Sequence, residues 1–123
     1  MIFLDTNVLL ELILPGRSRI KEVEKLIADY PEVVISTLSI HLCWHFGRQA
    51  GVSDELIAAF VGTCQLVSLD PQDYYWAQNN QQGKDFEDAL QIACSIRNAC
   101  SPFFTMDRRL MKRYASFTEF ITV

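Results

Sequence analysis

Four aspartates lie at positions where the secondary structure is expected to change. Asp5 and Asp107 each follow a short, largely apolar segment, and Asp85 and Asp88 open a strongly periodic helical segment. Carboxylates that are distant in sequence but meet at one edge of a sheet can form an oxygen-ligand site for Mg²⁺ or Mn²⁺. If the four side chains converge, their chemistry is that of a metal-dependent phosphodiesterase. If they do not, they are four ordinary helix caps.

The elements that must position these acids follow from hydrophobic periodicity. Short strands are predicted at residues 2–4, 33–35, 66–67, 103–104 and 117–121. Helices are predicted at about residues 6–14, 18–30, 38–50, 53–64, 71–82, 85–98 and 107–114. Strands that alternate with helices favour an α/β fold, in which helices cover both faces of a parallel sheet.

This topology is expected to bring the four acids to one edge of the sheet. Asp5 and Asp107 end strands, whereas Asp85 and Asp88 begin a helix that runs antiparallel to those strands. The carboxyl ends of parallel strands and the amino ends of such helices share the edge where ligands bind. For any single acid, helix capping is the simpler interpretation, because Asp is a preferred N-cap. For the set, a common site is favoured, since caps alone would be scattered over both edges.

The composition indicates a globular chain, and we expect one domain over residues 1–123. Half of the residues are hydrophobic, and no apolar stretch approaches the length of a membrane span. The first residues lack the basic region and apolar core of a signal peptide, so a cytoplasmic location is predicted. Cys43, Cys64 and Cys94 lie in apolar helical patterns without a C-x-x-C pair, which indicates reduced core thiols.

The net charge of −4 does not by itself indicate nucleic-acid binding, but the basic residues are clustered. One cluster consists of Arg108, Arg109, Lys112 and Arg113. Because it follows Asp107 directly, it could engage RNA phosphates beside the acids, or it could be a solvated helix face. A second cluster, at residues 17–25, is interpreted as solvated surface.

Three motifs in order resemble the PIN domain family. Residues 2–10 (IFLDTNVLL) resemble the opening of the family, residues 85–90 (DFEDAL) its third acidic motif, and residues 105–107 (TMD) its fourth. Ile35-Ser36 followed by a helix resembles the second block of the family. The similarity spans nearly the whole chain at the expected size, and three motifs in order are fairly specific.

The resemblance implies a three-layer fold, with a central parallel sheet of about five strands flanked by helices. It also implies cleavage of RNA that depends on Mg²⁺ or Mn²⁺. Asp5, Asp88 and Asp107 would hold the metal, and Asp85 would assist at the rim or cap its helix. Compact PIN proteins of this length are typically VapC toxins of bacterial toxin–antitoxin pairs. An RNA substrate, a small antitoxin partner and a homodimer are therefore expected.

Small polar residues adjoin the predicted ligands. Thr6 and Asn7 follow Asp5, and Thr105 lies two residues before Asp107. Such side chains can orient a carboxylate or hold a water molecule bound to the metal.

One feature departs from the family pattern. The family usually carries a glutamate early in the helix after the second strand, and alignment places Leu42 there. No Asp or Glu occurs from Val33 to Ser53, so one carboxylate of the usual site is missing. His41 could act as a substitute ligand, which would suit Mn²⁺ or Zn²⁺ better than Mg²⁺, or it could be an ordinary helix side chain, as we interpret His45.

These observations leave two main functions in competition. The first is an active, metal-dependent endoribonuclease. The second is a PIN-fold module that binds RNA or a partner, with weak or lost catalysis because Leu42 replaces the acid. A phosphatase with Asp5 as its nucleophile is disfavoured, because no second aspartate follows two residues later and no clear lysine motif for phosphate is present.

Overall fold

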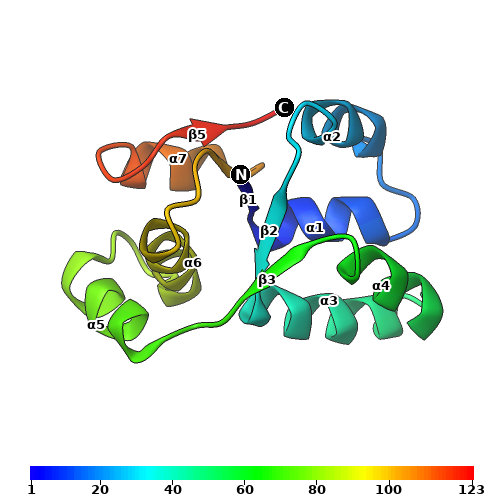
Figure 1. Ribbon diagram of the computed structural model, residues 1–123, viewed down its shortest axis with the longest axis horizontal. Helices are drawn as coiled ribbons and strands as arrows, with labels where there is room; N and C mark the ends of the chain where they lie inside the picture. Colours follow the sequence, from blue (N-terminus) through cyan, green and yellow to red (C-terminus); the bar gives the residue numbers. More distant parts are fainter.

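The computed structural model describes all residues, 1–123, and has a five-stranded parallel sheet at its centre (Figure 1). The strands are β1 (Ile2–Leu4), β2 (Val33–Ser36), β3 (Gln65–Val67), β4 (Phe103–Phe104) and β5 (Phe120–Ile121). They are ordered β3-β2-β1-β4-β5, and every neighbouring pair is parallel. The predicted α/β class, with about five parallel strands, is confirmed.

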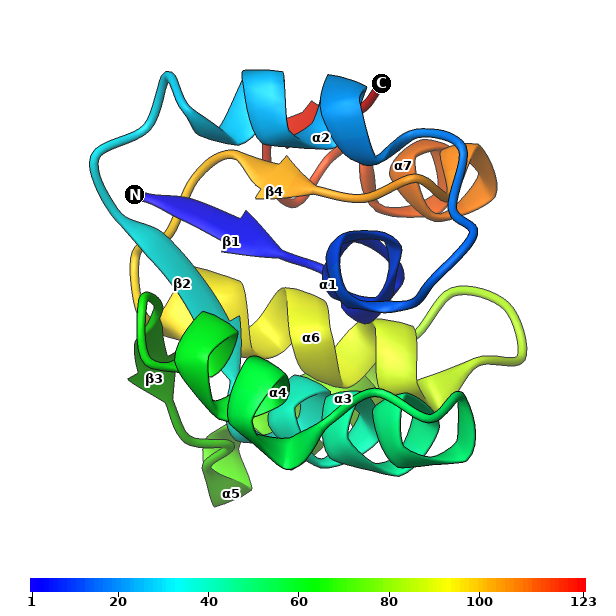
Figure 2. The same ribbon diagram turned by 90° about the vertical axis from the view of Figure 1, so that its right-hand side faces the viewer.

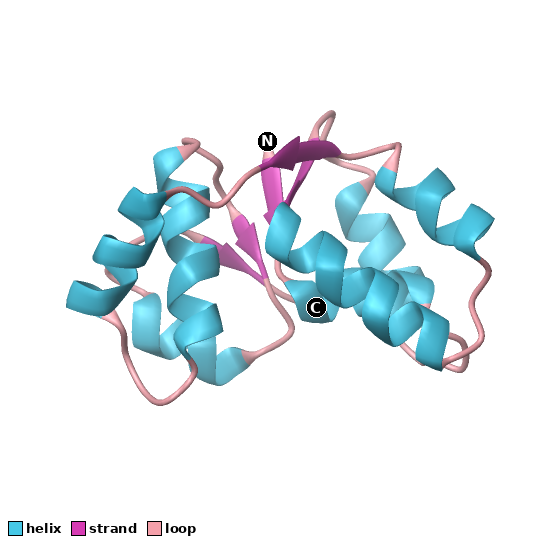
Figure 3. Ribbon diagram, turned by 90° about the horizontal axis from the view of Figure 1, so that it is seen from below, coloured by secondary structure: helices cyan, strands magenta, loops and turns pink.

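Seven helices cover the two faces of the sheet, which gives the expected three layers (Figures 1 and 3). They are α1 (Thr6–Ile13), α2 (Ile20–Ile27), α3 (Thr37–Gln49), α4 (Asp54–Val61), α5 (Pro71–Asn80), α6 (Phe86–Arg97) and α7 (Arg108–Tyr114). Figure 1 shows α1–α4 on one side of the strands and α5–α7 on the other. None of the helices has both the length and the apolar character that crossing a membrane requires.

Successive side chains of the central strands belong to two separate hydrophobic clusters, one on each face of the sheet. Ile2 and Leu4 of β1 pack with α1–α4 on one face, whereas Phe3 packs with α5–α7 on the other. All three side chains are fully buried. A strand that is covered on both faces is continuously apolar. For this reason the run at residues 2–4 marks the central strand of the sheet.

The direction of strand addition reverses beside β1. The chain adds β2 and then β3 on one side of β1, and later adds β4 and β5 on the other side; Figure 2 shows β1 between β2 and β4. At such a switch point the connections leave in opposite directions, which opens a crevice at the carboxyl ends of the strands. Asp5 follows β1 and Asp107 lies three residues beyond β4, so both flank this crevice.

Some predicted elements are shorter in the structure. The helix expected over 18–30 is α2 (Ile20–Ile27): Arg19 is its N-cap, and after Ile27 the backbone N–H groups of Asp29 and Tyr30 donate to carbonyls three residues back instead of four. The strand expected over 117–121 is β5 (Phe120–Ile121). Phe117 lies outside it, because its backbone N–H donates to the Tyr114 carbonyl in a turn, and its ring packs against the rings of Trp76 and Tyr114. All four cysteines are free, although Cys64 is only half-buried.

Candidate active site

Asp5 is held at the carboxyl end of β1 by two hydrogen bonds. As the N-cap of α1, it accepts from the Thr6 backbone N–H at 2.8 Å through Oδ1. Its Oδ2 accepts from the Thr105 hydroxyl at 2.8 Å. Asp5 is 5% exposed, and burial raises the pKa of its carboxyl group from 3.8 to about 6. Both oxygens keep one free lone pair, so an oriented carboxylate faces the crevice.

Polar residues after β1 and β4 tie the two strand ends together. Asn7 donates through Nδ2 to the Thr105 hydroxyl at 3.1 Å and accepts at Oδ1 from the Met106 backbone N–H at 3.1 Å. Thr105 Oγ1 also accepts from the Asp107 backbone N–H at 3.1 Å. Thr105, which was predicted to orient a carboxylate, thus contacts Asp5 directly, whereas Asn7 contacts Thr105 and does not hydrogen-bond to Asp5.

The start of α6 brings two further carboxylates to the same edge. Asp85 is the N-cap and accepts from the Glu87 backbone N–H at 3.0 Å. Asp88 is half-buried and its side chain forms no hydrogen bond in the structure. Burial raises the pKa of Asp88 from 3.8 to about 7, and the neighbouring Asp85, Asp5 and other carboxylates add to this increase. Asp88 is therefore the carboxylate that most lacks a positive partner.

Asp107 caps α7 and accepts from the backbone N–H groups of Arg109 and Leu110 at 2.9 and 3.2 Å through Oδ1. Its charge contributes to the raised pKa values of both Asp5 and Asp88. Capping and a common site are therefore compatible, because one carboxylate oxygen can cap a helix while the other faces the crevice.

The acids meet at a cavity of about 310 Å³. Its lining consists of Asp5, Thr6, Asn7, Leu10, Leu42, Phe46, Asp85, Glu87, Asp88 and Asp107. The structure therefore brings together all four aspartates that the sequence singled out. Leu42 also lies on the wall, so the position that lacks an acid faces this cavity. His41 is not among the lining residues; it is exposed and stacks with His45 at a ring distance of 6.4 Å.

Glu87 is a fifth carboxylate at this cavity that the sequence interpretation overlooked. It is half-buried, and its Oε1 lies 3.4 Å from the Thr6 hydroxyl, which donates to it. Burial, and then the charge of Asp85, raises the pKa of Glu87. The only signal in the sequence is its place between two predicted ligands, and helix periodicity assigns it no face on its own.

Behind the acids lies a neutral network that the sequence interpretation also missed. The Gln91 amide Nε2 donates to the hydroxyls of Thr6 and Ser39 at 3.0 and 2.6 Å, and Gln91 Oε1 accepts from the Ser36 hydroxyl at 2.7 Å. These four side chains come from α1, α3, α6 and the end of β2, and all are buried. The network therefore fixes the three helices relative to one another directly behind the cavity.

The donor chemistry of the cavity fits a divalent cation. Its polar lining is almost entirely oxygen and includes five carboxylates, and neighbouring negative charges add to the raised pKa values of Asp5, Glu87 and Asp88. Oxygen donors of this kind suit Mg²⁺ and Mn²⁺. In the structure, however, no three acidic, histidine or cysteine side chains are close enough together to hold one ion. Binding would therefore require them to move together.

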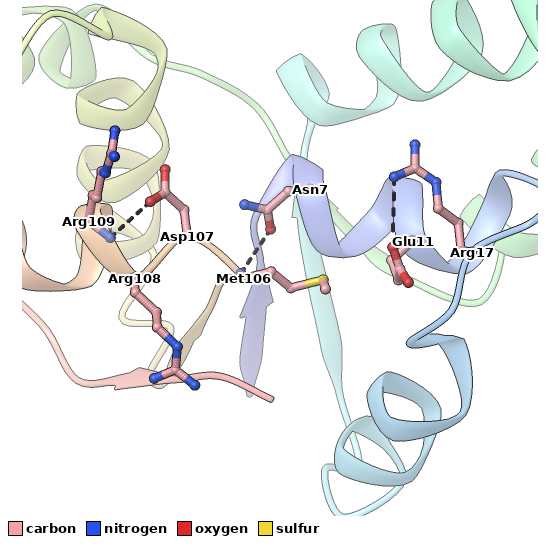
Figure 4. Close-up of a pocket in the computed structure, with 7 residues that line it drawn as sticks. All are labelled: Asn7, Glu11, Arg17, Met106, Asp107, Arg108 and Arg109. Atoms are coloured by element: carbon pink, nitrogen blue, oxygen red, sulfur yellow. Dashed lines mark hydrogen bonds and ion pairs between the residues drawn. The ribbon is translucent and has the colours of Figure 1, made fainter.

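The predicted basic cluster divides between two places. Arg108 and Arg109 line a second cavity of about 640 Å³, which also includes Asn7, Glu11, Arg17, Met106 and Asp107 (Figure 4). Arg113 instead lies over Gly83, where an added Cβ would meet its guanidinium carbon at 2.9 Å. Lys112 is exposed and lines neither cavity. A helix places successive side chains on different faces, which explains the division.

The sheet order and the carboxylates at its switch point define a class: an α/β domain with an acidic site built by separate strand–helix junctions. The family model of the PIN domain matches residues 2–116, so the chain belongs to the PIN domain family. No match was found among curated proteins.

Several solved structures share the fold. VapC20 of Mycobacterium tuberculosis, described as a Sarcin-Ricin loop cleaving toxin, has a TM-score of 0.75 and 19% identity, over 97% of this chain and 98% of that one. A toxin–antitoxin complex from Klebsiella pneumoniae has a TM-score of 0.79 and 16% sequence identity, and the match covers 99% of this chain and 97% of that one. VapBC2 of Rickettsia felis, bound to a DNA fragment from its promoter, has a TM-score of 0.72 and 12% sequence identity, and the match covers 100% of this chain and 99% of that one.

Proposed function

We propose that this PIN domain protein is a metal-dependent endoribonuclease and the toxin component of a toxin–antitoxin pair. The observation that carries the proposal is the convergence of Asp5, Asp85, Asp88 and Asp107 on one cavity at the switch point of the sheet. Capping accounts for Asp5, Asp85 and Asp107 but not for Asp88, which caps no helix and contributes a further carboxylate to the cavity. The shared fold of the VapC and toxin–antitoxin structures supports the toxin assignment.

Asp5, Asp88 and Asp107 would hold a Mg²⁺ or Mn²⁺ ion, with Asp85 and Glu87 at the rim. A divalent ion bound there supplies positive charge that polarises a phosphodiester and makes water a better nucleophile. Asp5 would bind without losing much side-chain freedom, because Thr6 and Thr105 already fix its two oxygens. Asp88, whose pKa is about 7, would release a bound proton as the cation arrives.

The test is cleavage of a structured RNA by the purified protein in EDTA, Mg²⁺ and Mn²⁺. We expect cleavage only with the metals, and none by Asp5→Asn. Asp29→Asn, a change of the same charge at an exposed residue away from the cavity, should cleave like the unmodified protein. Absence of cleavage with either metal, or equal cleavage by Asp5→Asn, would overturn the proposal.

The toxin role has its own test. We expect induced expression to stop bacterial growth, expression of Asp5→Asn to leave growth unchanged, and a small protein encoded beside the gene to restore growth and copurify. We also propose a homodimer, which sedimentation of the purified chain would measure. Growth that is equally slow with the variant would contradict the toxin role.

One observation favours a second function, in which the protein binds RNA or a partner with weak or lost cleavage. Leu42 lies on the wall of the acid cavity, and no three side chains are arranged around one ion. This alternative predicts RNA binding without cleavage, and cleavage that appears only after Leu42→Glu supplies the missing carboxylate.

A further inference from the structure

We propose that the cavity lined by Arg17, Arg108 and Arg109 binds the phosphate backbone of the RNA beside the cleaved bond. Arg17 is thereby assigned to the RNA-binding surface. The inference rests on the proposed function, because it takes RNA as the substrate. Arg17 lies outside the basic cluster that follows Asp107 in the sequence.

The arginine-lined cavity adjoins the acid cavity. Asn7 and Asp107 line both of them, so a strand that leaves the acids on this side enters the arginine-lined cavity. Figure 4 shows Arg108 and Arg109 at the start of α7 on one side, with Arg17 on the loop after α1 on the other and Asn7 between them. The volume is about 640 Å³, roughly twice the 310 Å³ of the acid cavity.

The charges in the two cavities are complementary to a cleavage site and its flanking strand. The acid cavity repels phosphate, and the chain as a whole carries a net charge of −4. Three guanidinium groups next to it provide local attraction, against the two carboxylates of Glu11 and Asp107. The side chains of Arg108 and Arg109 are exposed and form no salt bridge, so both are available. A guanidinium fork matches two phosphate oxygens.

Glu11 positions Arg17. Its carboxylate is buried, and a buried charge requires partners. Oε1 accepts from the Arg19 backbone N–H at 2.8 Å, and Oε2 lies 3.9 Å from Arg17 Nη1. These contacts hold the loop after α1 against the helix, with the Arg17 side chain 44% exposed towards the cavity. The loop that carries Arg17 is therefore held against α1 beside the cavity.

The lining of the cavity favours a nucleic-acid backbone over a protein partner. Met106 is its single hydrophobic residue, and the other six are polar or charged. Protein interfaces usually have an apolar centre, whereas interfaces with nucleic acids are polar and positively charged.

The test measures binding of a short fluorescent single-stranded RNA by anisotropy, in EDTA and at several salt concentrations. The variants are Arg17→Gln, Arg17→Lys and Lys25→Gln. Lys25 is a matched control, because it is exposed on α2, lines neither cavity and loses the same charge. We expect Arg17→Gln to weaken binding about three- to tenfold and to lower the salt slope by about 0.7, the effect of one lost phosphate contact on a single strand. Arg17→Lys should keep most of the slope.

Equal RNA affinity and equal salt slope for Arg17→Gln and Lys25→Gln would overturn the inference. The same holds if Arg17→Gln weakens the binding of a protein partner but leaves the RNA affinity unchanged. Thermal unfolding of each variant separates lost contacts from lost folding, and a folding defect would not change the salt slope. Binding without metal is independent of cleavage. RNA binding that depends on Arg17, without cleavage, would sustain this inference and refute the enzyme. RNA cleavage by the unmodified protein that is unchanged in Arg17→Gln, with unchanged RNA binding, would support the enzyme and refute this inference.

Discussion

The acid cavity and the neutral network behind it lie side by side but satisfy their polar groups in opposite ways. Both draw on α6, which contributes Glu87 and Asp88 to the cavity and Gln91 to the network one turn later. In the network, Gln91 donates to Thr6 and Ser39 and accepts from Ser36. No buried side-chain nitrogen or oxygen of the protein lacks a partner. Buried polar groups that are fully paired make a unique arrangement of helices.

The acid cavity lacks this balance. Asp88 has no hydrogen-bond partner, and the pKa values of Asp5 and Asp88 are raised to about 6 and about 7. Like charges held together in a partly buried place lower the stability of the folded state. The network therefore stabilises the fold by itself, whereas the acids lower its stability, and the cation proposed to bind there would relieve their repulsion.

The largest expected effect is on activity at the acid cavity. Asp88→Asn should lower metal-dependent RNA cleavage at least about a hundredfold, since changes even outside the ligands of a metal commonly cost 10- to 100-fold. The same variant should raise the melting temperature in EDTA at pH 8, because it removes a repelling charge. Cleavage assays and thermal unfolding measure the two effects. A variant that is both active and less stable would contradict the contrast between the two regions.

In the neutral network the effect should fall on stability alone. Gln91→Leu should lower the free energy of unfolding by about 2 kcal/mol, because Thr6, Ser36 and Ser39 lose buried partners. Urea denaturation measures the change. Gln78→Leu, on the exposed face of α5, is the control and should change stability little. If Gln91→Leu proved as stable as the control, the network would not be what fixes α1, α3 and α6 relative to one another.

The pH dependence of stability should come from the acids. A carboxyl group with a raised pKa binds more protons in the folded state, so stability falls as the pH rises through the interval between its unfolded and folded pKa values. For Asp5 that interval runs from 3.8 to about 6, and Asp88 extends it to about 7. Between pH 5 and pH 8, Asp5 alone should lower stability by roughly 1 kcal/mol in EDTA. Melting curves with saturating Mn²⁺ should lose most of this slope, and an equal slope with and without Mn²⁺ would argue against a cation at the acids.

The smallest expected effect comes from the wall position that lacks an acid. Leu42→Glu should raise the affinity for Mn²⁺ about threefold, equal to roughly 0.7 kcal/mol, because the added ligand also adds repulsion. Calorimetric titration with Mn²⁺ measures this, and Leu42→Gln is the uncharged control. In EDTA, Leu42→Glu should melt at a lower temperature than Leu42→Gln. Affinity that is unchanged relative to Leu42→Gln would place residue 42 outside the metal site.

The sequence by itself predicted the fold class and the edge where the acids meet. Both follow from local rules: the apolar run at residues 2–4 marks a buried central strand, and helices begin at capping acids such as Asp85 and Asp107. Strand and helix order then fixes the shared edge without knowledge of any long-range contact. Leu42 was singled out by the resemblance to the family, and the structure places it on the cavity wall.

Only the tertiary structure determined how individual side chains around that edge divide their roles. Glu87 and Gln91 lie one turn apart on the same face of α6, and Thr6 contacts both, yet only Glu87 lines the acid cavity, whereas Gln91 is buried deeper, between α1, α3 and the end of β2. Arg17 joins Arg108 because the buried Glu11 holds the loop after α1. Such contacts link residues far apart in the chain, and helical periodicity defines the faces of a helix without specifying what each face meets.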